Sequence, residues 1–258
     1  MRFLKPTHAQ LKKWAGLELA KNRKEENLFL AEGAKIVKDV LRSAWVTSAL
    51  LIREDRKEHF QEWGSAFPGK IDAYVLTERE WHRLSQDRSS EGIIAVASVP
   101  PMPAVCDLAS LEDERLLLLH EINNPNNLGA LLRAADWFGF GTVLLSRGSV
   151  DFTHPKAVRT AMGSLFRMKA IANLDFAEIL SVLRSSHCLI GSDVRTGLAP
   201  HTCKEPVALL LGSESHGLPE KLSGMADEVW RIPGSGRAES LSLPQAAAIL
   251  MYACTATS

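Results

Sequence analysis

In the first hundred residues, stretches in which apolar residues have the spacing of a helix alternate with stretches in which they have the spacing of a strand. Residues 8–24 form a polar stretch with the spacing of a helix, and residues 29–44 (FLAEGAKIVKDVLRSA) predict an amphipathic helix with apolar positions at 36, 37, 40 and 41. Three apolar runs predict strands: VTSALLI (46–52), IDAYVLT (71–77) and GIIAVASV (92–99). The helical stretches EDRKEHFQEWGSAF and EREWHRLSQ follow the first two strands. This half of the chain therefore predicts a small α/β unit.

A proline-rich segment then interrupts the alternation. PPMPAVCDLASLEDE (100–114) has three prolines in four residues, which favours an extended linker. We expect two domains, residues 1–104 with the linker and residues 105–258.

The second half predicts a larger parallel sheet. LLLLH (116–120) is apolar throughout, as in strands buried on both faces, and a helix over about 128–138 and GTVLLS (141–146) complete a βαβ unit. A helix at 155–164, the segment FRMKAIA and the helix FAEILSVLRSS follow. Then come HCLIGSDV, PVALLLGSE (206–214), EVWRIP (228–233) and a last helix over 242–254. We expect an α/β fold with five or six mostly parallel strands and helices on both faces.

Composition is that of a water-soluble globular protein. The 258 residues are 46% apolar and 23% charged, and no apolar run approaches the roughly 20 residues of a membrane span. The start, MRFLKPTHAQ, has no apolar core and does not predict a secretory signal. Four cysteines lie far apart without a CxxC pair, which argues against zinc and against a disulfide framework: Cys106, Cys188, Cys203 and Cys254. We expect that the protein works in the reducing cytoplasm and binds no metal.

Charge is balanced overall but not locally. Net charge is zero, whereas residues 1–24 carry seven Lys or Arg against one acid. That segment is either a contact for nucleic-acid phosphates or a solvated helix face, and charge alone leaves both open.

Three strand ends combine glycines with small polar side chains. The first is EINNPNNLG (121–129), with four asparagines; the others are GSESHGLP (212–219) and IPGSGRAESLS (232–242). In open α/β sheets ligands bind at such ends. The sequence has neither GxGxxG after a first strand nor GxxxxGK[ST], so it does not predict the usual binding site for a dinucleotide or a nucleoside triphosphate. Each loop also has a plain structural interpretation: a turn at Gly212 and Gly217, a helix cap at Ser240 or Ser242, and a surface cation at Arg133.

Taken together and in this order, the three loops resemble the motifs of the SpoU (TrmH-type) branch of the SPOUT methyltransferases, which methylate the ribose 2′-hydroxyl of tRNA or rRNA. The motifs here read NNPNNLGALLRAADWFGFGTVLLS, LLLGSESHGLP and RIPGSGRAESLSLPQAAAILMY. GSVDFTHPKAVRTAMGSLFRM between them is also similar to the family. KNRKEENLFLAEGAKIVKDVL and SSEGIIAVAS resemble the ribosomal-protein-like substrate-binding domain that precedes the catalytic domain in many members.

The resemblance implies a parallel sheet with a deep trefoil knot, a homodimer and S-adenosylmethionine as cofactor. It implies that structured RNA, tRNA or rRNA, is the partner. Carried over residue by residue, it places the cofactor at Leu210, Gly212, Ile232 and Leu241. It assigns Asn127 and Arg133 to the first motif, Glu214 to the second and Ser240 to the third, as the catalytic group.

Three positions depart from the family pattern. Ser242 stands where SLN usually has asparagine, Gly234 makes IPG of the common IPM, and Ser215 replaces a frequent glycine. A serine hydroxyl reaches less far than an amide and offers fewer donors. These changes keep open an alternative, a catalytically silent RNA-binding protein with the same fold. The first motif argues against a third reading, methylation of a base.

Overall fold

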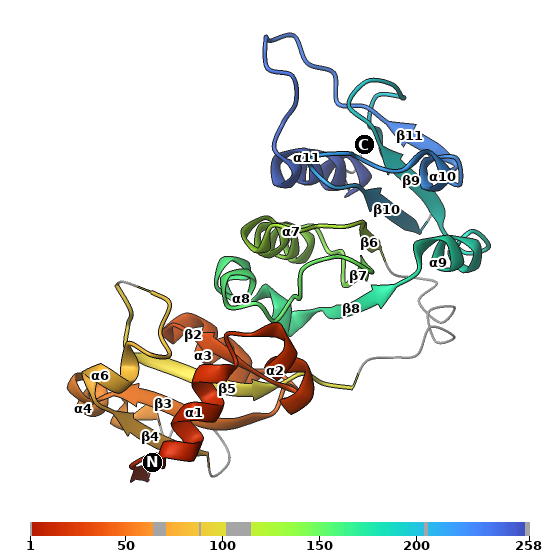
Figure 1. Ribbon diagram of the computed structural model, residues 1–258. Helices are drawn as coiled ribbons and strands as arrows, with labels where there is room; N and C mark the ends of the chain where they lie inside the picture. The colour runs from red at the N-terminus through yellow and green to blue at the C-terminus, as the bar shows by residue number, and fades with distance from the viewer. Residues whose placement is uncertain (1, 64–70, 88, 102–114, 204–205, 256–258) are drawn as a thin grey trace. The chain divides into compact units, whose positions relative to one another are not determined.

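The computed structural model describes residues 2–63, 71–87, 89–101, 115–203 and 206–255 (Figure 1). The chain divides into two compact units, which we describe separately. Unit 1 comprises Met1–Pro101 together with Thr153–Phe166, and unit 2 comprises Met102–Phe152 together with Arg167–Ser258. The predicted boundary between residues 104 and 105 lies outside the described residues. None of the helices in the described ranges combines the length and apolar character needed to cross a bilayer.

Unit 1 contains a mixed five-stranded sheet in the order β1-β4-β3-β5-β2. Strands β1, β4 and β3 run parallel, and β5 pairs antiparallel with both β3 and β2. The bounds are β1 Phe3–Leu4, β2 Leu28–Glu32, β3 Thr47–Arg53, β4 Asp72–Leu76 and β5 Ile93–Ser98. The three strands predicted in this half are therefore confirmed.

The helices of unit 1 correct two predictions. The bounds are α1 His8–Gly16, α2 Ala20–Glu26, α3 Ala34–Arg42, α4 Lys57–Gln61, α6 Glu78–Trp81 and α8 Pro155–Ala161, with 3-10 turns at Glu54–Arg56 and Ser164–Arg167. The single helix predicted over 8–24 is two helices, because α1 ends at Gly16 and the next residue, Leu17, is the C-cap, with its side chain fully buried. The helix predicted over 29–44 was wrong in its first part: Phe29, Leu30 and Ala31 are buried strand residues paired with β5, and Gly33 at φ 109° separates them from α3.

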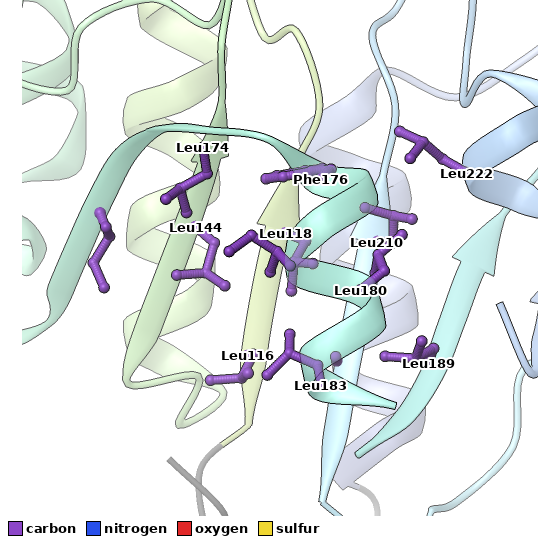
Figure 2. Packing of buried hydrophobic residues seen from close by; sticks show 13 residues of the cluster. Leu116, Leu118, Leu144, Leu174, Phe176, Leu180, Leu183, Leu189, Leu210 and Leu222 are labelled. Carbon is purple, nitrogen blue, oxygen red and sulfur yellow. The ribbon is translucent and has the colours of Figure 1, made fainter. Parts of the chain in front are cut away.

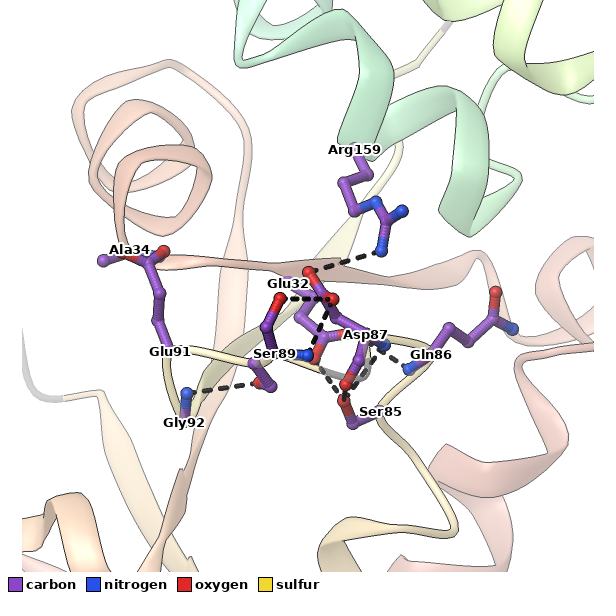
Figure 3. A network of polar contacts seen from close by, with 10 residues as sticks. Glu32, Ala34, Ser85, Gln86, Asp87, Ser89, Glu91, Gly92 and Arg159 are labelled. Atoms are coloured by element: carbon purple, nitrogen blue, oxygen red, sulfur yellow. Dashed lines mark hydrogen bonds and ion pairs between the residues drawn. The ribbon is translucent and has the colours of Figure 1, made fainter.

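A segment from the second half of the sequence belongs to unit 1, which the sequence did not predict. Phe166 stacks on Phe29 with ring centroids 6.3 Å apart. Arg159 forms an ion pair of 3.3 Å with Asp87, at the rim of a polar network (Figure 3). The Arg23 guanidinium is buried and donates to the Thr153 hydroxyl at 3.2 Å. Arg23 therefore holds the fold together and does not contribute to an exposed basic surface.

Unit 2 contains a six-stranded sheet in which every strand pair is parallel, in the order β11-β9-β10-β6-β7-β8. The bounds are β6 Leu116–Leu119, β7 Thr142–Ser146, β8 Lys169–Leu174, β9 Cys188–Ser192, β10 Val207–Leu211 and β11 Glu228–Trp230. Every residue of β6, β7 and β10 is buried, as expected for central strands covered on both faces. The predicted parallel α/β fold is confirmed.

Helices of unit 2 cover this sheet. They are α7 Pro125–Trp137, α9 Phe176–Leu183, α10 Glu220–Ser223 and α11 Leu243–Thr255. Figure 2 shows α9 placing Leu180 and Leu183 over the leucines of β6 and β10, including Leu118 and Leu210. Helices α7 and α11 pack against each other. Because β6 and β10 are parallel neighbours, the loops that follow them leave the same edge of the sheet.

Candidate active site

The asparagine-rich loop begins helix α7. Asn124 has extended backbone, and its side chain accepts hydrogen bonds from the N–H groups of Asn126 at 2.9 Å and Asn127 at 3.4 Å. Pro125 follows in the first turn, where its missing N–H has no intrahelical partner to lose. Asn124 is therefore an N-cap, which explains one of the four asparagines by helix chemistry alone.

Asn127 connects the first loop to the second. Its side-chain amide donates a hydrogen bond to a carboxylate oxygen of Glu214, in the loop after β10. Asn127 is half-buried and Glu214 is exposed, so the pair lies at the surface of the sheet edge. The structure therefore brings together two of the four residues predicted as catalytic, from positions far apart in the sequence.

The second loop is a tight turn that folds back on its own strand. The Gly217 N–H donates to the Ser213 carbonyl at 2.8 Å, and the His216 N–H donates to the Ser213 hydroxyl at 3.3 Å. A Cβ on Gly212 would lie 2.1 Å from the Gly217 carbonyl carbon and 2.3 Å from the Leu218 nitrogen. The close approach of the turn itself therefore requires glycine at position 212.

The third loop leaves the sheet after β11 and leads directly into α11. Its start is held by main-chain bonds, because the Leu198 N–H donates to Val229 and the Arg231 N–H donates to Leu198, both at 2.8 Å. Ile232 is half-buried, whereas Ser240 is exposed and Leu241 has 46% of its surface exposed. The Ser242 carbonyl accepts from the Ala246 N–H at 3.0 Å, in the first turn of α11.

A carboxylate fixes the turn beside this loop. Asp193 accepts from the N–H groups of Arg195 at 2.6 Å and Thr196 at 2.8 Å. The Thr196 backbone bond is the main cause that lowers the pKa of Asp193 below its usual value. The turn brings Leu198 against Trp230, so the base of the third loop is anchored on two sides.

Two of the predicted site residues, Arg133 and Leu210, lie at opposite extremes of burial. Arg133 is exposed on α7 and forms no hydrogen bond or ion pair with another described residue. The Leu210 side chain is buried in the leucine cluster under α9, so only its backbone could contact a ligand. Among the described residues, no hydrogen bond or ion pair joins Arg133 or Ser240 to Asn127 or Glu214.

His120 is a residue that the sequence analysis missed. It ends the run LLLLH, and its N–H donates to the Leu211 carbonyl at 2.8 Å, so it lies where β6 and β10 both end. Its ring nitrogen Nδ1 is buried without a hydrogen-bond partner among the described residues, and its Nε2 lies 3.8 Å from the Glu121 carboxylate. The position directly after an all-apolar strand was the available signal. Within the described ranges no three His, Cys, Asp or Glu side chains are grouped as metal ligands.

An Asn–Glu pair and two glycine-containing loops lie at the carboxyl edge of the parallel sheet, which is where open α/β proteins bind their ligands. The model of the SpoU rRNA Methylase family matches residues 114–252, and the model of the MRM3-like substrate binding domain matches residues 8–95. The chain belongs to the SpoU rRNA methylase family, as its three loops predicted.

Individual relatives agree with this assignment. The chain is 28% identical over 247 residues to the 23S rRNA (guanosine(2553)-2′-O)-methyltransferase RlmP of Bacillus subtilis, covering 94% of each chain. Its fold is similar to that of a TrmH-family RNA methyltransferase from Porphyromonas gingivalis, with a TM-score of 0.80 and 28% identity over 96% of this chain and 97% of that one. An AdoMet-bound rRNA methyltransferase from Sinorhizobium meliloti has a TM-score of 0.82 and 26% identity, with 97% and 96% covered.

Proposed function

We propose that the protein transfers a methyl group from S-adenosylmethionine to a ribose 2′-hydroxyl of tRNA or rRNA. The observation that carries the proposal is the hydrogen bond between Asn127 and Glu214, which joins the first two motif loops at one edge of the sheet. The third loop, with Ser240 and Leu241, follows β11 and so leaves the same edge of the parallel sheet. In open parallel sheets this edge is where ligands bind.

The cofactor's surroundings follow from the second and third loops. The half-buried Ile232 and the exposed Leu241 offer apolar surface for an adenine ring, and the backbone near Leu210 and Gly212 offers hydrogen-bonding groups at the strand end. These residue types fit S-adenosylmethionine. The bound cofactor supplies an electrophilic methyl group on a sulfonium ion.

Arg133 acts on the RNA by charge. A guanidinium stays protonated in proteins, so it is not a proton acceptor. Arg133 is exposed without an intramolecular partner among the described residues, which leaves its planar fork available for a phosphate next to the target ribose. There it stabilises the charge that develops on the 2′-oxygen. Asn127 and Glu214 hold the loops in place, and Ser240 lies at the entrance to α11.

Residues 1–104 form the RNA-binding part. The match of residues 8–95 to a substrate-binding domain supports this, and so do the exposed lysines of α1 and α2. Lys13 and Lys21 are engaged with Glu26 at 2.5 Å and Glu25 at 3.7 Å. Lys12 and Lys24 are therefore the better candidates for phosphate contacts.

The catalytic part, residues 105–258, assembles as a homodimer through α7 and α11. Trp137 is 83% exposed, Tyr252 61% and Ile249 42%, although all three are large apolar or aromatic side chains. Phe138 and Tyr252 lie in edge contact at 6.2 Å, so the exposed residues of the two helices are continuous. A second copy of the same face would cover them.

Two further features complete the proposal. The turn at Gly212–Leu218 and the loop from Ile232 to Ser242 form a deep trefoil knot, as the resemblance of the three motifs to the family implies. The protein works in the cytoplasm, where it meets structured RNA.

Measuring cofactor binding and methyl transfer separately tests the function. Titration calorimetry with S-adenosylmethionine should show binding, and tritium from labelled cofactor should appear in total tRNA or rRNA that lacks the modification. Ser242, in place of the usual asparagine, favours the silent RNA-binding alternative. Binding of cofactor and RNA without transfer to any RNA would support that alternative and contradict the enzyme.

A further inference from the structure

The turn after β9 is exposed to solvent but rigidly held. It covers residues 193–198, and its Asp193 N–H donates to the last carbonyl of β11 at 3.0 Å. The Leu198 N–H donates to the Val229 carbonyl at 2.8 Å. Gly197 has a φ of 135°, and a Cβ built on it would lie 2.5 Å from the Val229 carbonyl oxygen. Only glycine permits this approach, so the turn has a fixed shape against β11.

Two large apolar side chains of this turn are exposed. Val194 has 65% and Leu198 has 56% of its surface accessible to solvent. They belong to neither α7 nor α11, so the proposed dimer face does not account for them. Apolar side chains that a rigid turn holds in solvent indicate a surface that contacts another molecule.

Two arginines lie beside these apolar side chains. Arg195 follows Val194 in the turn and is exposed. The Arg231 Nε donates to the Val194 carbonyl at 3.3 Å, which holds this guanidinium against the turn. Within the described ranges, neither guanidinium forms an ion pair with a carboxylate. The Asp193 carboxylate attracts Arg195, but one of its oxygens accepts two backbone N–H bonds and the Thr196 hydroxyl, which engages its charge inside the turn. The turn therefore presents positive charge together with apolar surface.

We propose that this turn and Arg231 form a contact surface for the RNA substrate. The guanidinium groups of Arg195 and Arg231 bind backbone phosphates. The side chains of Val194 and Leu198 pack against a ribose or a base. This inference rests on the proposed function, which makes RNA the substrate. A second copy of the chain fits the surface less well, because a two-fold contact would bring the same arginines face to face.

The surface lies at the same edge of the sheet as the candidate active site. Strand β9 pairs in parallel with both β10 and β11, so the turn leaves the sheet at its carboxyl edge, as the loop of Glu214 does (Figure 1). Arg231 directly precedes Ile232, where the third loop begins. RNA bound to this surface is therefore held next to the start of the third loop.

The salt dependence of RNA binding tests the surface in the full chain. The probe is rRNA transcribed in vitro, cut into fragments and labelled with fluorescein, and anisotropy measures its affinity at a series of salt concentrations. The double variant Arg195→Gln, Arg231→Gln should reduce the steepness of log affinity against log salt concentration by roughly 1.4 units, the value for two phosphate contacts on single strands. Arg195→Gln alone should give about half of this change. Its side chain has no hydrogen bond to lose among the described residues, so the fold should stay intact.

Arg184→Gln is the matched control, because Arg184 is an exposed arginine of the same unit. It pairs with Asp227 at 3.6 Å, and Asp227 accepts from the Leu189 N–H at 2.9 Å, which places Arg184 at the opposite edge of the sheet, where β9 begins. Its replacement should leave the slope unchanged. Thermal melting and calorimetry with S-adenosylmethionine should give the wild-type result for Arg195→Gln and for the control.

The surface is wrong if the double variant keeps the wild-type slope, if Arg184→Gln reduces the slope equally, or if wild-type protein binds no RNA. A change of oligomeric state in the double variant, measured by light scattering, would mean that a second copy covers the turn and would also overturn it. Methyl transfer to the same transcripts is measured separately. If wild-type protein transfers no methyl group but the slopes change as expected, the proposed function is contradicted and the RNA surface is supported.

Discussion

Replacing Gly212 by alanine tests the geometry of the second loop. The new Cβ would lie 2.1 Å from the Gly217 carbonyl carbon and 2.2 Å from its oxygen, whereas side chains essentially never approach closer than 3.0 Å. The obstructing atoms are backbone, so no side-chain rotation can relieve the overlap. Overpacking of this kind costs typically 1–3 kcal/mol. Because the turn itself must move, we expect Gly212→Ala to lower the free energy of unfolding by an amount at the upper end of this range, about 3 kcal/mol.

Gly234→Ala is the matched control. No atom lies within 4 Å of a Cβ built at Gly234, and its backbone is outside the left-handed region. Alanine there should be neutral or slightly stabilising. Urea unfolding measures the stability of both variants, and calorimetry measures their affinity for S-adenosylmethionine. We expect Gly212→Ala to bind the cofactor at least about tenfold more weakly, a difference of roughly 1.4 kcal/mol. Equal stability and equal affinity in the two variants would mean that the second loop accommodates a Cβ at position 212, which contradicts this prediction.

Three further predictions concern Arg133, the lysines and the helix face. Arg133→Ala should abolish methyl transfer and leave cofactor affinity nearly unchanged in calorimetry. Arg133→Lys should also transfer methyl groups slowly, because a point charge cannot replace the planar fork of the guanidinium. Transfer by the alanine variant near the wild-type rate would remove Arg133 from the mechanism. Changing Lys12 and Lys24 to Gln should reduce the steepness of the plot of log RNA affinity against log salt concentration by roughly 1.4 units, the value for two lost phosphate contacts on single-stranded RNA. An unchanged slope would mean that Lys12 and Lys24 only face solvent. Trp137→Glu should yield monomers by light scattering, with the wild type dimeric at micromolar concentration; a monomeric wild type would contradict the proposed interface.

Strong periodic signals explain which elements could be predicted from the sequence. LLLLH and GTVLLS are apolar without interruption because their strands are covered on both faces, and the structure confirms both as β6 and β7. The helix predicted over 29–44 failed at Phe29–Ala31, because three apolar residues before a glycine fit either period. Pairing with β5, a contact that is distant in the sequence, makes this stretch a strand.

The candidate site was predictable only in part, for similar reasons. Motif order identified Asn127 and Glu214, and the structure places them in contact. The position of the Thr153–Phe166 segment in unit 1 and the burial of Arg23 depend on tertiary contacts that no local pattern encodes.

The central claim is methylation of a ribose, and nucleoside analysis of the labelled product tests it most directly. RNA lacking the modification is incubated with the protein and with S-adenosylmethionine labelled in its methyl group, then digested to nucleosides and separated. Wild-type protein should place the label in a single 2′-O-methylnucleoside, and Arg133→Ala should give no labelled nucleoside. Label in a methylated base, or bound cofactor with no labelled nucleoside, would contradict it.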